Sequence, residues 1–574
     1  MSTPPKKHDC PILNLIKGCG CQSNTTSSSC CGDDHNHPHD HVTSSGNQEK
    51  HSHSHDHAHD SSHTHSHETA AASTPPVTVP DEATENDATP AISAEQEKEL
   101  LADLQDFDNN PAEFMDRSPR KRVEQAGGTD TNLPFFDQAA IDNKAYVGAR
   151  DELRTSFEAN DADHATRAAF TSNDLAQNLV DSYSYTSLQS MQANNLMNVR
   201  LNNQPWSDDY WAICRGIIGK RYADPGFPKS SDWNTCHNYV SSRPAASVLT
   251  SGSTTAINNL SPSEKYDILV GDSNYTLTKK MWAEGAKFGG NVAPWMGICH
   301  GWAPASYMLP RPTKAITVLA ADGHTQLTFY PSDIKGLASL LWANASPGTK
   351  FIGGRCNVEN PARDINGRLI EAACFDTNPG TWHLAVVNQI GVSKRSMVLD
   401  VTFDYEVWNQ PVLGYRYLHF NPQSMTYQSS LAAAAVSRAN YTRDKFSSYH
   451  SNQTASIVGI KMFVLYMVET TPSHNSPDSS GKDVINEVEY MYDLELDFSG
   501  KIIGGEWRSI KHPDFLWTPT KSSRARTNYE PSGTWQSGQS VPSSWRSAAV
   551  SASNAAKPAP LAAIVEQLIS LSNS

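Results

Sequence analysis

The chain has 574 residues, 38% of them hydrophobic, and a formal net charge of -15 at pH 7. This length and composition allow a large buried core. The acidic balance argues against a nucleic-acid partner, because phosphate binding needs a basic surface. No apolar run approaches the roughly 18–20 residues that span a bilayer, so no transmembrane segment is expected.

The first region of the chain, residues 1–92, is rich in Ser, Thr, Asp, His and Pro and has no Phe, Tyr or Trp. Such a composition predicts disorder, because there is little to bury. The histidines between His35 and His67 predict weak transition-metal binding, since closely spaced imidazoles bind zinc, copper or nickel. The simpler alternative is a soluble histidine-rich tail. The sequence requires no cofactor and leaves calcium dependence open.

Three further regions follow. Residues 93–204 are predicted to form helices that pack on the core, with one helix beginning after Ser93 at Glu95 and another within Ser172–Leu201. Residues 205–535 mix helical and strand patterns and form the predicted catalytic domain. Residues 536–574 are predicted to be mostly disordered, with a short helix over Leu561–Leu571. The fold class is therefore α+β.

Within residues 205–535, a helix is predicted over Thr276–Gly285. Short apolar runs bounded by turn residues predict the strands. These runs are Ile316–Ala320, Leu327–Tyr330, His383–Ile390, Ser396–Phe403, Val458–Glu469 and Tyr490–Asp497.

Cys299 is the strongest candidate for a catalytic nucleophile. An irregular segment with Pro294 and Gly297 leads into this cysteine, and a short helical run follows it to Met308. A thiol at a helix N-terminus faces the positive end of the helix dipole, which favours the reactive thiolate. Free backbone N–H groups there can also stabilise an oxyanion. The simpler alternative is a buried structural cysteine.

A cysteine nucleophile needs a base, and His383 stands at the start of an apolar run that reads as a strand. If residues 383–400 form a hairpin centred on Gly391-Val392, Asp400 lies directly opposite His383. Asp400 would then orient the imidazole of His383. The sequence thus predicts a triad of Cys299, His383 and Asp400.

Other residues compete for these roles. Asp404 lies four positions beyond Asp400, and Asn409 is a candidate for an orienting amide. His300 directly follows Cys299, but adjacent residues on a helix point in different directions. We therefore rank it below His383 as the base.

A family resemblance rests on several segments. Residues 407–415, Val-Trp-Asn-Gln-Pro-Val-Leu-Gly-Tyr, resemble the peptide elicitor motif of the oomycete cell-wall transglutaminases, the transglutaminase elicitor family. The resemblance covers roughly residues 200–520, and Leu413 stands where the motif has a basic residue. It includes the segments Gly297–Trp302, Trp382–Ala385, Asp400–Glu406, Gly504–Trp507 and His512–Trp517.

The resemblance implies a papain-like cysteine catalytic core with Cys299, His383 and Asp400 as the triad. It also implies a protein-glutamine gamma-glutamyltransferase that joins glutamine-donor proteins to lysine or polyamine acceptors through a thioester. An extracellular location is implied, although the segment Pro11–Ile16 does not predict a signal peptide. Two alternatives remain: a cysteine protease or glutamine deamidase with the same triad, or a non-catalytic recognition or metal-sequestering protein.

Overall fold

The computed structural model describes residues 92–127, 174–251, 253–345, 347–354, 358, 360–402, 407–529 and 531–574. The region predicted to be disordered, with its histidine tract, lies almost entirely outside these residues. In the described part, strands of one large antiparallel sheet follow the order β1-β11-β10-β7-β6-β13-β5. Additional short strands pair with β7, β10 and β11. No helix in the described ranges is long and apolar enough to cross a membrane.

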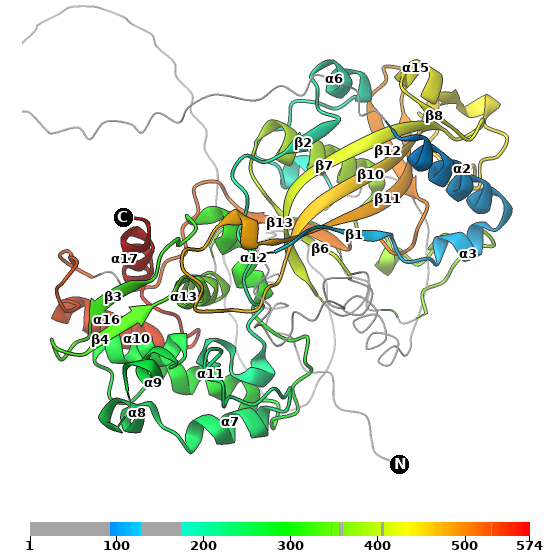
Figure 1. Ribbon diagram of the computed structural model, residues 1–574. Coiled ribbons are helices and arrows are strands. Elements are labelled where there is room, and N and C mark those ends of the chain that lie inside the picture. Colours follow the sequence, from blue (N-terminus) through cyan, green and yellow to red (C-terminus); the bar gives the residue numbers. More distant parts are fainter. Residues whose placement is uncertain are drawn as a thin grey trace, which may run out of the picture. The chain divides into compact units, whose positions relative to one another are not determined.

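The longest strands, β7, β10 and β11, form the middle of this sheet (Figure 1). Their alternating side chains are buried on both faces for most of their length, because helices and loops cover the sheet. The strands of the large sheet are β1 (Lys121–Ala126), β2 (Asn198–Arg200), β5 (Thr349–Gly353), β6 (Val398–Asp400), β7 (Asn409–Asn421), β8 (Thr426–Gln428), β9 (Val436–Ser437), β10 (Ser456–Val468), β11 (Val484–Leu496), β12 (Ile502–Trp507) and β13 (Phe515–Pro519).

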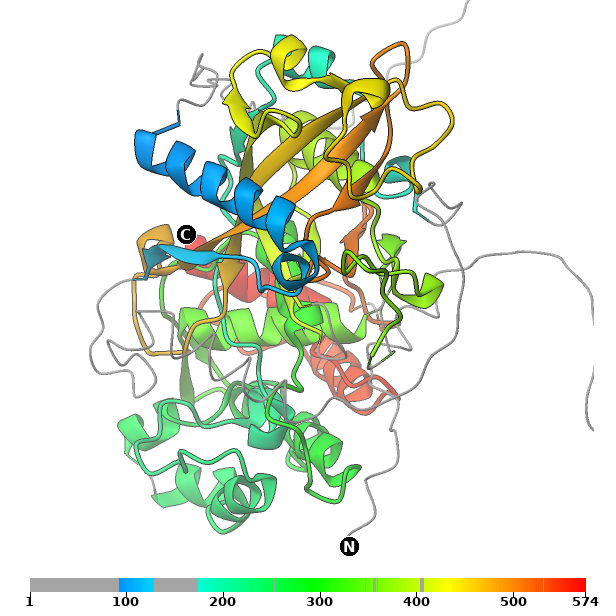
Figure 2. The same cartoon turned by 90° about the vertical axis from the view of Figure 1, so that its right-hand side faces the viewer.

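A group of helices and a separate hairpin pack together beside the sheet (Figures 1 and 2). The hairpin consists of β3 (Ile316–Leu319) and β4 (Gln326–Phe329). Helix α12 contacts both α13 in this group and strand β7 of the sheet, so it joins the two layers. The helices of the group are α7 (Trp233–Ser241), α8 (Ala245–Ser251), α9 (Thr254–Asn258), α10 (Pro262–Val270), α11 (Thr276–Ala286), α12 (Cys299–Met308), α13 (Pro331–Asn344), α16 (Ser543–Ser553) and α17 (Ala562–Asn573).

The remaining helices pack on or near the sheet. Helix α14 (Pro379–Val386) lies against β11 and β12 and continues as a π-helical turn over Val387–Val392. Helices α2 (Ala94–Asn109) and α15 (Leu431–Ala434) lie beside β8. The others are α3 (Pro111–Met115) and α6 (Leu188–Ala193).

Several predicted elements are confirmed. Helix α2 begins after Ser93, whose side chain accepts a hydrogen bond from the Gln96 backbone in a capping box. Helices α11 and α17 are present close to their predicted bounds. Strands β3, β4, β10 and β11 are longer or shorter than predicted by a few residues, and a shortened β6 is also present. The structure therefore confirms a mixed helix and sheet fold.

Three predictions are wrong. The described part of Ser172–Leu201, residues 174–201, is not a long helix: it contains a single 3-10 turn, helix α6 and strand β2, joined by irregular backbone and a turn. Residues 536–574 are not mostly disordered, because α16 and α17 bury Trp545, Ile564 and Leu568 in the core. Finally, the apolar run that begins at His383 forms helix α14 and its π-helical extension, not a strand.

Candidate active site

The position of Cys299 is fixed by the segment that precedes it. Backbone hydrogen bonds join Ile298 N to the Tyr210 carbonyl (2.7 Å) and Ile213 N to the Met296 carbonyl (2.8 Å). A Cβ atom on Gly297 would lie 2.4 Å from the Tyr210 carbonyl oxygen, so only glycine permits this close approach. The chain therefore enters α12 along a fixed path, with Cys299 as the first residue of the helix.

Helix α12 is held equally closely from the other side. A Cβ atom on Gly301 would lie 2.1 Å from the Ser339 carbonyl oxygen, which shows that α12 and α13 are in backbone contact. The indole Nε1 of Trp302 donates to the Trp206 carbonyl over 3.0 Å. These contacts leave the first turn of α12 little freedom to move relative to its neighbours.

The thiol of Cys299 is buried, with 2% of the residue exposed. Its Sγ lies 3.7 Å from the Val407 carbonyl, to which the thiol donates. The side-chain amide of Asn409 donates to Sγ over 3.5 Å. The Asn409 Oδ1 in turn accepts a 2.7 Å hydrogen bond from Nε1 of Trp517, which fixes the orientation of the amide.

The charge state of Cys299 follows from these surroundings. Burial raises the pKa of the thiol to about 12, and the hydrogen bonds from Asn409 oppose this rise. The nearby carboxylates of Glu469 and Asp400 add to it. In this closed arrangement the thiol is neutral at physiological pH, and Asn409 is the neighbour that favours the thiolate.

Asp400 pairs with Asn409 across strands β6 and β7. Its Oδ1 accepts hydrogen bonds from the Thr402 backbone (3.2 Å), the Thr402 hydroxyl (2.7 Å) and the Trp408 backbone (2.9 Å). Asp400 therefore holds together the two ends of the connection between β6 and β7. The predicted pairing of Asp400 with His383 in a hairpin is wrong, because its partner in the sheet is Asn409.

His383 lies inside helix α14 and is fully buried. Its Nδ1 is 2.9 Å from the Tyr492 hydroxyl, and its ring packs edge-on against Tyr417 at a centroid distance of 4.7 Å. Among the described residues its Nε2 has no hydrogen-bond partner. Burial, with a contribution from His419, lowers the pKa of His383 to about 3. The imidazole is thus neutral and makes no hydrogen bond to Cys299 or Asp400.

The other candidates from the sequence are placed as follows. Asn409 contacts the thiol and not an imidazole. His300 is buried on α12, and burial lowers its pKa to about 4. Asp404 lies outside the described residues. Cys214 and Cys236 are free and buried like Cys299, so they are natural controls for its role.

Sequence reasoning missed Trp517, which orients the Asn409 amide, and Glu469, whose charge acts on the thiol. Trp517 belongs to the late segment that contributes to the family resemblance, so a signal for its importance was present. Glu469 had no such signal: it lies just beyond β10 and accepts a 2.6 Å hydrogen bond from Nε2 of Gln410. Residues 407–415, the segment that resembles the elicitor motif, are buried along β7. In the folded chain this segment therefore supports the site around Cys299 and is not displayed on the surface.

Together these features define a class: a mixed helix and sheet protein in which a buried cysteine begins a helix packed against an antiparallel sheet. The chain belongs to the transglutaminase elicitor family, whose model matches residues 176–532. No curated protein matches it. The solved structure of the GP42 transglutaminase from Phytophthora sojae is similar, with 22% identity, coverage of 62% of this chain and 93% of that one, and a TM-score of 0.44.

Proposed function

We propose that this protein is a protein-glutamine gamma-glutamyltransferase with Cys299 as its nucleophile. The observation that carries the proposal is the thiol at the first position of α12, with the Asn409 amide directed at Sγ. Membership of the transglutaminase elicitor family supports the same reaction class.

The reaction has two half-reactions. The Cys299 thiolate attacks the carboxamide carbon of a protein-bound glutamine, and the C–N bond breaks as ammonia leaves with an added proton. A lysine or polyamine nitrogen then attacks the thioester, forming the isopeptide bond and releasing the thiol. N–H groups at the start of α12 and the Asn409 side chain are suited to stabilise the negative charge that develops in both steps.

The acid–base partner is a separate question. His383 as base and Asp400 as orienting residue stay predictions, because the resting arrangement has no hydrogen bond between the imidazole and either Cys299 or Asp400. Because Nδ1 of His383 contacts Tyr492, Nε2 is the ring nitrogen left to act as the base. Substitution of His383 tests this directly.

The experiment that tests the function follows incorporation of a fluorescent primary amine into a glutamine-containing protein. Release of ammonia is measured in the same reaction, with and without the amine. A transglutaminase incorporates the amine in proportion to the ammonia released. Ammonia release without incorporation would indicate a glutamine deamidase, and cleavage of the backbone of the glutamine-containing protein would indicate a protease; either result overturns the proposal.

A further inference from the structure

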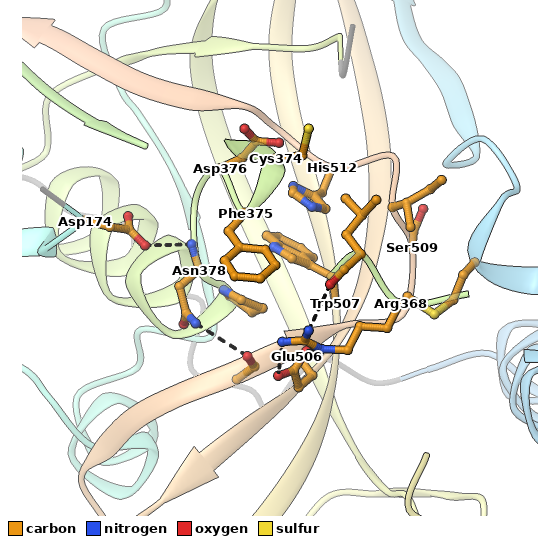
Figure 3. Close-up of a pocket in the computed structure, with 15 residues that line it drawn as sticks. Asp174, Arg368, Cys374, Phe375, Asp376, Asn378, Glu506, Trp507, Ser509 and His512 are labelled. Carbon is orange, nitrogen blue, oxygen red and sulfur yellow. Dashed lines mark hydrogen bonds and ion pairs between the residues drawn. The ribbon is translucent and has the colours of Figure 1, made fainter. Parts of the chain in front are cut away.

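A cavity of about 80 Å³ lies beside the start of α14, and Cys299 is not among the residues that line it (Figure 3). At roughly 10–15 Å³ per water-sized group, it has room for several such groups. Cys299 makes its hydrogen bonds to Val407 and Asn409, and neither of these lines the cavity. The residues that define its chemistry are Asp174, Arg368, Phe375, Asp376, Trp507 and His512.

Asp174 supplies an unused acceptor. The residue is 6% exposed, and its Oδ2 accepts a 2.7 Å hydrogen bond from the Asn378 backbone at the cap of α14. Its Oδ1 is buried and has no partner among the described residues. A buried carboxylate oxygen without a donor costs free energy, so a ligand that donates to it is favoured.

Asp376 supplies a second unused hydrogen-bond acceptor. Its Oδ1 is also buried without a described partner. Burial, together with the charges of Asp400 and Asp174, raises the pKa of Asp376 to about 8. Burial also raises the pKa of Asp174 to about 7. Among the described residues, no neighbouring positive charge offsets the effect of burial on these two carboxyl groups.

The rest of the lining does not supply that charge. Arg368 is committed to Glu506 by two hydrogen bonds of 2.7 and 2.9 Å, and its guanidinium lies over the ring of Tyr449. Burial lowers the pKa of His512 to about 4, so it is neutral, and its ring stacks on Trp507 at 4.7 Å. The cavity thus combines two carboxyl groups, each with one oxygen that has no partner among the described residues, with aromatic side chains, an environment that favours cations.

The geometry favours an organic cation over a metal ion. Among the described residues, no group of three or more His, Cys, Asp or Glu side chains is placed to hold a metal, whereas calcium needs six to eight oxygen ligands. An ammonium group has three N–H donors and needs only a few acceptors. We propose that this cavity binds a primary ammonium group, at the end of either a lysine side chain or an alkyl diamine.

The ligand is of the same chemical class as the acceptor in the proposed reaction, but binding here does not require that reaction. The test therefore uses the full chain with Cys299→Ala, in which no acyl transfer can occur. Titration calorimetry at pH 8 measures binding of 1,5-diaminopentane and, in a second arm, of Nα-acetyllysine methylamide. The two arms distinguish a free diamine from a lysine side chain as the source of the ammonium group.

Two substitutions locate the site. Asp174→Asn keeps a side-chain oxygen that can accept the hydrogen bond from the Asn378 backbone N–H. Asp376→Asn is compatible with the left-handed backbone at position 376, where φ is 42°. Each should weaken amine binding at least tenfold. Asp322→Asn, in the exposed turn of the β3–β4 hairpin, is the matched control and should leave binding unchanged. Thermal unfolding of each variant confirms that it is folded.

The results separate this inference from the proposed function. Binding of at least one amine that is lost in both cavity variants supports the site, even if the wild-type chain fails to incorporate amines. Absence of binding for both amines overturns it, as does binding that survives both substitutions. The proposal is also overturned if the chain binds neither amine but binds calcium in a way that depends on Asp174, because the ligand would then be a metal ion.

Discussion

The side-chain amide of Asn409 donates a hydrogen bond to Sγ of Cys299 over 3.5 Å. The two residues come from the first position of β7 and the first position of α12, which are more than a hundred positions apart in the chain. This contact lies where a helix N-terminus meets the sheet, and it is the polar interaction that most directly favours a thiolate at Cys299.

Replacing Asn409 should therefore impair chemistry more than binding. We expect Asn409→Ala to lower kcat for amine incorporation by about 10²–10³, the usual cost of removing one donor from an oxyanion site, with little change in KM. Asn421→Ala, at the opposite end of the same strand, is the control and should retain kcat. Equal rates for wild type and Asn409→Ala would remove Asn409 from the mechanism.

Trp517 should act through Asn409. Trp517→Phe keeps an aromatic ring but removes the Nε1 donor that orients the Asn409 amide. Loss of one hydrogen bond is worth about 0.5–1.5 kcal/mol, so we expect a decrease in kcat of roughly two- to tenfold. The ascending limb of the pH–rate profile should also move to higher pH, because the pKa of the Cys299 thiol rises when the thiolate loses the support of Asn409.

The matched control is Trp545→Phe in α16, which removes a comparable indole hydrogen bond to the Ser532 carbonyl. Its rate and pH profile should match those of the wild type. If both tryptophan variants lowered kcat equally, the effect of Trp517 would be one of general stability and not of positioning Asn409.

The sequence and the structure lead to different expectations for the effect of substituting His383. A general base contributes about 10²–10⁴ to the rate, so a base role predicts at least a hundredfold loss in His383→Gln. The buried contact of His383 with Tyr492 instead leads us to expect a loss below tenfold, with a lower free energy of unfolding. Kinetics on folded protein, with Tyr492→Phe for comparison, decide between the two.

The prediction of a strand beginning at His383 is wrong for a physical reason. Apolar β-branched residues such as Val386, Val387 and Ile390 are typical of a buried strand, but helix α14 is buried on all sides and needs the same residues. Burial removes the amphipathic pattern that distinguishes helix from strand. By contrast, α2 was predictable because it has a polar face and a capping box at Ser93.

The site was predictable in part. The position of Cys299 at a helix start follows from the local sequence and is present in the structure. Its partners are not local: Asn409 and Trp517 reach it only through the pairing of β7, β6 and β13, which no spacing in the sequence specifies. The register of Asp400 opposite Asn409 depended on the same long-range pairing.

His450 should make stability depend on pH. Burial opposes its charge, but Asp444 (2.7 Å) and Glu495 (3.2 Å) outweigh it and raise the pKa of His450 to about 10. The unfolded residue loses its proton near pH 6.5. The stabilisation is therefore complete below about pH 6.5 and is lost as pH rises towards 10, at up to about 1.4 kcal/mol per pH unit.

Urea unfolding at pH 6.5 and 8.5 measures this effect. The free energy of unfolding of the wild type should fall by about 2 kcal/mol more than that of His450→Gln, which has no proton to lose at this position. Parallel changes in the two proteins would show that His450 is not held in its charged form by Asp444 and Glu495.

The central claim is that Cys299 carries the acyl group, and acid trapping of the intermediate tests it most directly. The full chain is mixed with a glutamine-containing peptide without an amine, quenched in acid, digested and mapped by mass spectrometry. We predict an adduct on the fragment with Cys299, equal to the peptide minus one ammonia, that is retained in Cys214→Ala and Cys236→Ala and absent in Cys299→Ala. An adduct on another residue, or unchanged amine incorporation by Cys299→Ala, would contradict the account.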